Sequence, residues 1–174
     1  FGGLIYFVLP ALFFYLFVVI VPSIRGSVYA FTDWNGLAQD FKFVGFSNFV
    51  GVFKVEQSNH AIMVTLIIAI SVTVFQNFVG LLLALGVNSK IRSRNFLRVL
   101  FFTPVVMSPV VVAYVWQFLL SPNGPINSIV SFLSAGNLRP SWLGDPNLAL
   151  ASIIIVIIWQ FAGFSMVIFL AGLQ

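Results

Sequence analysis

Cysteine is absent from the 174 residues of the chain. This absence excludes disulfide bonds and thiolate metal sites, and it leaves the redox state of the compartment undetermined. Charged residues are scarce as well: they make up 7% of the chain, whereas a soluble domain has about 25%. They are missing altogether from four long stretches, at 1–24, 61–89, 99–138 and 146–174.

Residues that commonly carry enzyme chemistry are few. The chain has one histidine, His60, and its four acidic residues all lie outside the uncharged stretches. A metal site needs several His, Cys or carboxylate ligands together, and none is suitably placed near His60, which we interpret as a residue at the entry to an apolar helix. The sequence also contains no glycine-rich phosphate-binding loop. We therefore expect neither enzyme activity nor a metal site in this chain.

Apolar side chains dominate what is present. They make up 60% of the chain, with 21 phenylalanines among them, and the mean hydropathy is +1.09. A domain of this size cannot enclose so much apolar surface, because much of a small domain stays in contact with its surroundings. We predict an all-α integral membrane protein, since backbone groups in lipid must be satisfied within helical segments.

The uncharged stretches predict the membrane spans. A helix needs about 20 apolar residues to cross a bilayer core, and the Pro and Gly residues at 121–125 prevent the third stretch from holding two helices. Pro109 removes a backbone hydrogen bond within the third span, so we expect a kink there. The four predicted transmembrane helices lie at about 3–24, 62–87, 99–120 and 148–171.

The basic residues predict the orientation of these helices. The connection at 88–98 has no acid, whereas basic and acidic residues are equal in number at 25–60 and at 121–147. An excess of Lys and Arg marks cytoplasmic loops, so 88–98 is expected in the cytoplasm and the other two loops outside. We interpret this excess chiefly as a topology signal, with binding of lipid headgroups as a minor addition. The basic residues concerned are Lys90, Arg92, Arg94 and Arg98.

The first outer loop has a pattern of its own. Phe49, Val52 and Phe53 recur at helical spacing, which predicts a short helix at 47–54 lying on the membrane interface.

Neutral polar residues occur inside the predicted spans. Gln76 and Asn77 lie about halfway along the second span, and Ser108 and Gln117 lie in the third. For these four we favour interhelical packing, in which amides form hydrogen bonds between helices. Asn77 and Gln117 remain secondary candidates for substrate binding.

The fourth predicted span carries a patterned face. Ile157, Gln160, Phe161, Phe164 and Ile168 follow the spacing i, i+3, i+4, i+7 and i+11, so they share one stripe of a helix. The stripe combines one amide with two aromatic rings. A neutral sugar offers hydroxyl groups to an amide and C–H faces to a ring, so such a stripe could bind one near the membrane midplane. The alternative is an aromatic packing seam without a ligand.

Several local patterns agree with a single family, and they follow one another in that family's order. The chain resembles the membrane-spanning permease subunits of ATP-binding-cassette importers, within the group that carries sugars and includes the maltose permease. The matching stretches are FTDW (31–34), FVGFSNF (43–49), GLLLAL (80–85), RNFLRVLFFTPVVMSPVVVAYVWQFLL (94–120), NGPINSIV (123–130), WLGDPNLAL (142–150) and WQFAGFSMVIFLAGLQ (159–174).

This resemblance implies a fold and a set of partners. It implies that the chain is part of a larger six-helix-type permease, incomplete at both ends, in the cytoplasmic membrane of a prokaryote. The expected partners are a second homologous permease, two cytoplasmic ATPase subunits that bind ATP and magnesium, and an extracytoplasmic solute-binding protein. The chain itself is expected to hold no cofactor and to contact sugar and membrane lipid but no nucleic acid.

The resemblance also implies site residues. Counted from Trp159, the positions that contact sugar in maltose-type permeases correspond to Ile157, Gln160, Phe161 and Phe164, which lie on the stripe described above. The residue types depart from the maltose-type pattern, so a different sugar, or a site carried mainly by the partner permease, is left open. The spans contain no fixed charge for a phosphate, which favours a neutral sugar over glycerol phosphate.

Two other hypotheses remain open from the sequence. The first is a secondary carrier or channel subunit for a small polar solute, which would transport without nucleotide. The second is a structural or assembly protein of the membrane, whose spans would tolerate a change such as Gln160→Leu.

Overall fold

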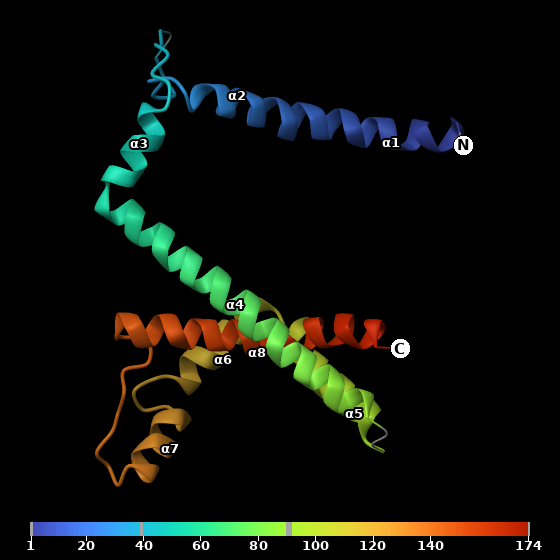
Figure 1. The fold of residues 1–174 in the computed structure, drawn as a ribbon, viewed down its shortest axis with the longest axis vertical. Helices are drawn as coiled ribbons and strands as arrows, with labels where there is room; N and C mark the ends of the chain where they lie inside the picture. Colours follow the sequence, from blue (N-terminus) through green and yellow to red (C-terminus); the bar gives the residue numbers. More distant parts are fainter. Residues whose placement is uncertain (1, 39, 90–91, 174) are drawn as a thin grey trace. The chain divides into compact units, whose positions relative to one another are not determined.

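The computed structural model describes residues 2–38, 40–89 and 92–173. It is built of helices (Figure 1), and among the described residues the only β-type pairing is an isolated bridge between Thr32 and Phe43. The expected all-α class is confirmed. In chain order the helices are α1 (Gly2–Tyr15), the π-helix η1 (Leu16–Ile20), α2 (Val21–Tyr29), α3 (Ser47–Lys54), α4 (Glu56–Asn88), α5 (Arg94–Val106), α6 (Pro109–Leu119), α7 (Pro125–Leu133) and α8 (Pro146–Gly172).

The chain divides into two compact units, Phe1–Met63 and Val64–Gln174. By length and composition, three helical stretches of the described chain can cross a membrane: Tyr6–Tyr29, Glu56–Asn88 and Pro146–Gly172. The number rises to four if the bent pair of α5 and α6 is counted as one span. The predicted ranges fall on these helices, although α4 begins at Glu56 rather than at 62.

The first unit contains α1, η1, α2 and α3. The π-type segment η1 ends two residues before Pro22. The nitrogen of Pro22 carries no hydrogen for a helical bond, and a π-type turn accommodates that loss. The helix predicted at 47–54 is confirmed as α3. The Nδ2 of Asn48 donates to the carbonyl oxygens of Ala30, at 2.9 Å, and Thr32, at 2.7 Å, so α3 is tied to the end of α2.

The second unit is held together where α8 meets α4 and α5 (Figure 1). A Cβ added at Gly163 of α8 would overlap the carbonyl oxygen of Phe101 and lie 3.0 Å from the Cα of Phe102. A Cβ added at Gly80 of α4 would lie 2.5 Å from the Cβ of Ser165. Small residues at these two points therefore allow the helices to approach closely. The contact continues into a buried apolar cluster of Ala84, Val87, Met166 and Leu170.

The third predicted span is interrupted. α5 and α6 are separated by Met107 and Ser108 and meet at a bend of 97°, so the helix predicted as continuous at 99–120 is two helices. The expected kink at Pro109 is thus a complete break, because a residue before proline is driven out of the helical conformation. Ser108 accordingly has φ −58° and ψ 134°. Pro109 then begins α6, where its missing N–H costs nothing.

The loop predicted to lie outside at 121–147 contains a helix that the sequence analysis left out. α7 begins at Pro125, and its first turn is anchored by Asn127, which is 3% exposed. The Nδ2 of Asn127 donates to the carbonyl oxygens of Ser121, Pro122 and Pro140 at 3.1–3.3 Å. The indole Nε1 of Trp142 donates to Asn127 Oδ1 at 3.0 Å. One amide therefore joins both ends of this loop.

Replacing Asn127 with alanine is expected to loosen the loop without unfolding the spans. The change leaves the Trp142 indole and three carbonyl groups without their partner, which should destabilise the loop by about 2 kcal/mol. Amide hydrogen exchange across 121–145, measured on the full-length protein, should become about 30-fold faster. The matched control is Asn123→Ala, because Asn123 is exposed and its side chain forms no hydrogen bond within the described part of the chain. Equal exchange in the two variants would contradict the anchoring role.

Candidate functional site

The candidate site is built on α8, whose start is fixed by local chemistry. The Oδ1 of Asp145 accepts hydrogen bonds from the backbone N–H groups of Asn147 and Leu148 at 2.9 and 3.1 Å. Asp is a favoured residue at this capping position, and Pro146 is suited to the first helical position. This start fixes which side chains share each face of α8.

The predicted stripe on α8 does not present one uniform surface. Phe161 and Phe164 are 36% and 51% exposed, and Ile168 is exposed as well. Gln160 is 5% exposed, and Ile157 is half-buried. The two aromatic rings are therefore accessible, whereas the amide lies at the edge of the stripe, in the packed part of the unit.

Gln160 contacts the break between α5 and α6. Its Nε2 donates to the carbonyl oxygen of Met107 at 3.4 Å, a long hydrogen bond. Met107 lies just past the end of α5, where carbonyl groups lack helical partners. The Gln160 amide thus supplies an interhelical hydrogen bond where the backbone needs one, which is the packing role considered as the alternative for such residues.

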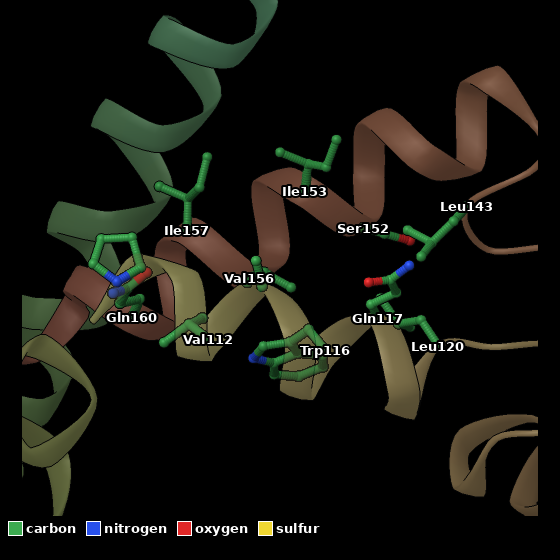
Figure 2. Close-up of a pocket in the computed structure, with 12 residues that line it drawn as sticks. Val112, Trp116, Gln117, Leu120, Leu143, Ser152, Ile153, Val156, Ile157 and Gln160 are labelled. Carbon is green, nitrogen blue, oxygen red and sulfur yellow. The ribbon is translucent and has the colours of Figure 1, made fainter. Parts of the chain in front are cut away.

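A cleft of about 250 Å³ lies between α6 and α8 beside Gln160, and we call it the α6–α8 cleft. Figure 2 shows Trp116 and Gln117 reaching it from α6, with Ile157 and Ser152 on α8. The amide of Gln117 points toward Ser152. The walls are mainly apolar, and none of the described residues that line the cleft is titratable. The chemistry of the cleft therefore suits a neutral ligand with both polar and apolar surfaces.

The structure brings together some of the sequence-predicted residues and separates others. Ile157, Gln160 and Gln117 line the α6–α8 cleft, whereas Phe161 and Phe164 are not among the residues that line it. Ile157 and Gln160 belong both to the stripe on α8 and to the lining of the α6–α8 cleft. They therefore join the cleft to the exposed aromatic part of the stripe. We call the two parts together the candidate substrate surface.

The other intramembrane amides have separate partners. Gln76 Nε2 donates to Ser165 Oγ at 3.0 Å, so the interhelical packing predicted for Gln76 is confirmed. Asn77 is exposed, and its Nδ2 donates at 2.7 Å to the Thr73 carbonyl oxygen of its own helix. Among the described residues, the prediction that Asn77 forms a hydrogen bond between helices is therefore wrong. The structure also does not bring Asn77 into the α6–α8 cleft.

Trp116 is a cleft residue that the sequence analysis missed. Its ring meets the ring of Trp159 edge to face, with the centroids 5.4 Å apart, and this contact positions one wall of the cleft. The sequence could have indicated Trp116, because it is adjacent to Gln117. An aromatic ring beside an amide is the same combination that drew attention to the stripe on α8.

Comparison with known proteins defines the class. No protein-family model matches the chain. The chain is 32% identical over 168 residues to the probable starch degradation products transport system permease protein AmyD of Thermoanaerobacterium thermosulfurigenes, covering 97% of the chain and 56% of AmyD. It is 32% identical over 167 residues to the multiple sugar-binding transport system permease protein MsmF of Streptococcus mutans, covering 96% of the chain and 55% of MsmF.

A solved structure agrees with these relatives. The chain superimposes on a crystal structure of a bacterial ABC transporter involved in the import of the acidic polysaccharide alginate, with a TM-score of 0.80 and 27% identity. The match covers 98% of this chain and 57% of the other. A second structure, of the alginate transporter in complex with a periplasmic protein bound to an alginate pentasaccharide, gives a TM-score of 0.79.

The apolar helices and these relatives define a membrane-embedded, multi-pass protein. More particularly, the chain is homologous to the permease subunits of ABC sugar importers, and the resemblance seen in the sequence is confirmed. Its homologues are transport permeases rather than enzymes. The chain spans between 55% and 59% of the length of the relatives matched first.

Proposed function

We propose that the protein is the permease subunit of an ATP-driven, binding-protein-dependent importer that moves a sugar across the cytoplasmic membrane of a prokaryote. The observation that carries the proposal is the match along nearly the whole chain to permeases of sugar transport systems. The α6–α8 cleft supports it, since amide, hydroxyl and indole groups surround a site without titratable side chains.

The proposed assembly follows the expectation from the sequence. A second homologous permease completes the pathway, two cytoplasmic ATPase subunits bind ATP with magnesium, and a solute-binding protein outside delivers the sugar. The complex with a sugar-bound periplasmic protein in the alginate system supports this kind of partner. The ATP chemistry belongs to the partner subunits, and this chain contributes the passage.

The function is tested by transport in vesicles that contain the full-length protein and its partners. Uptake of a labelled oligosaccharide should require both ATP and the solute-binding protein. A catalytically inactive ATPase subunit is the control and should abolish uptake. Uptake that persists without nucleotide would instead support a secondary carrier or channel for a small polar solute.

We propose that the sugar contacts the candidate substrate surface through Ile157, Gln160, Phe161 and Phe164, with Gln117 opposite. Asn77, which lies outside this surface, is a weaker candidate. The rings of Phe161 and Phe164 are exposed and available for stacking. The Gln117 amide is exposed at the cleft.

Phe164→Ala is expected to weaken sugar uptake while leaving expression and ATPase docking intact. Loss of one stacking contact should cost about 1–2 kcal/mol, which corresponds to a KM about 5- to 30-fold higher. Gln117→Ala should have an effect of the same order if the cleft contributes a contact. The matched control is Phe132→Ala, because Phe132 is exposed on α7 and lies outside the candidate substrate surface. Unchanged uptake in both variants would move the site to the partner permease.

A further inference from the structure

We propose that α7 (Pro125–Leu133) lies in the surface of the membrane with its apolar side in lipid, and is not part of a loop surrounded by water. The apolar side consists of Ile129, Phe132 and Leu133, and we call these three residues the α7 apolar face. Its occupant is the boundary between lipid headgroups and acyl chains, where interfacial helices bind. The inference goes beyond the proposed transport function, since it does not depend on which solute is carried.

The two opposite sides of α7 are reversed relative to those of a helix on a water-soluble protein. Ile129, Phe132 and Leu133 follow the spacing i, i+3, i+4, so they share one side, and they are 58%, 84% and 78% exposed. At 3.6 residues per turn, Asn127 lies roughly 170° around the helix from the centre of this side. Asn127 is 3% exposed, and its amide is bonded to three backbone carbonyl groups of the same unit. The amide thus faces the protein and the apolar side chains face outward, which lipid stabilises and water does not.

The absence of charge around α7 favours lipid over a soluble partner. No charged residue occurs in the sequence from 99 to 138, whereas a water-exposed surface carries charge on about 25–35% of its residues. Charges also orient soluble proteins that bind and dissociate, and between encounters such a partner would leave the α7 apolar face in water. A bilayer covers this face permanently and requires no charge.

The contacts of α7 place it at the level where the neighbouring apolar helices end. A Cβ added at Gly124, the residue before α7, would lie 2.5 Å from the carbonyl oxygen of Phe118 in the last turn of α6. Trp142 donates its indole N–H to Asn127 at 3.0 Å, and its carbonyl oxygen accepts from Ser152 Oγ at 3.4 Å. Ser152 lies in the second turn of α8, which is long and apolar enough to cross a membrane. α7 is therefore held close to the start of a span, at the depth of the headgroup boundary.

A further side of α7 is polar, as expected of a helix that borders both lipid and water. Ser128 and Ser131 of α7 line a cavity of about 490 Å³ together with Asn123 and Arg139. Phe132 also lines this cavity, so it stands at the border between the polar side and the α7 apolar face. An interfacial helix has its apolar side in the acyl boundary and its polar side toward water, and α7 has both sides.

The test measures which medium reaches the α7 apolar face in the full-length transporter, reconstituted in bilayers without its solute-binding protein. Phe132→Cys and Leu133→Cys are made separately in a transporter without other cysteines, and each cysteine carries a nitroxide spin label. Collisions of the label with oxygen, which concentrates in lipid, are compared with collisions with a water-soluble nickel complex. At both positions we expect the ratio of oxygen to nickel collisions to be several-fold higher than at the matched control Asn123→Cys. Asn123 is exposed and lines the polar cavity.

Each outcome of the labelling decides the question. An oxygen-to-nickel ratio at 132 and 133 no higher than at 123 would overturn the proposal, because the α7 apolar face would then lie in water. Protection of both labels from both reagents would also overturn it, because another protein surface would then cover the face. Ile129→Cys, on the same side of the helix, gives the same comparison if a label at 132 or 133 prevents assembly.

Discussion

Replacing Gly163 with valine is expected to prevent the second unit from folding. Gly163 is the point where α8 lies against the backbone of α5, and even a Cβ would overlap the carbonyl oxygen of Phe101. The obstacle is backbone rather than a flexible side chain, so the helices must separate to admit it. Overpacking of a core typically destabilises a protein by about 1–3 kcal/mol. Valine at this backbone contact should destabilise the second unit by about 3 kcal/mol or more.

The measurement for Gly163→Val is the yield of monodisperse full-length protein and its thermal unfolding temperature. Gly163→Ala should lie between valine and the wild type. Gly86→Ala is the matched control, because a Cβ at Gly86 of α4 meets nothing within 4 Å and alanine favours a helix over glycine. A wild-type unfolding temperature for Gly163→Val would refute the close approach of α5 and α8.

Gln160→Ala is the second change with a large expected effect, because this amide has two roles. It removes the hydrogen bond to Met107 at the break in the third span, which in a membrane is worth about 0.6–2 kcal/mol. It also removes the proposed sugar contact, worth about 1–2 kcal/mol. Sugar uptake is therefore expected to fall by tenfold or more, whereas assembly with the partner subunits should persist.

The two roles of Gln160 are separated by a matched amide. Gln76→Ala also removes an interhelical hydrogen bond, the one to Ser165, but Gln76 lies outside the candidate substrate surface. We expect it to lower the unfolding temperature about as much as Gln160→Ala while leaving the KM for sugar unchanged. If both variants changed the KM equally, Gln160 would act through packing alone.

The sequence predicted the helical elements well because their signals are local. The spacing of Phe49, Val52 and Phe53 was sufficient to place α3, and uncharged stretches were sufficient to locate the apolar helices. Pro109 likewise indicated a disturbed helix, although the complete break was not predicted. Helix α7 was missed because its first turn is anchored by Asn127, whose partners include the distant Trp142.

The candidate site was harder to predict from the sequence, because it depends on what each face of α8 contacts in the folded protein. A membrane helix such as α8 is apolar on all sides, so periodicity shows which residues share a stripe but not what that stripe meets. The sequence could not show that Gln160 turns toward Met107, which is 53 residues away in the chain. It also could not show the 97° bend that places α6 beside α8.

The break between α5 and α6 has a consequence for the solvent inside the membrane. Backbone groups without helical partners cannot face lipid tails, where each unsatisfied group costs several kcal/mol. Gln160 supplies one donor to Met107, but the other groups freed at the turn must be met by protein or by water. The turn at Met107 and Ser108 must therefore be covered by protein or by water, and not by lipid tails.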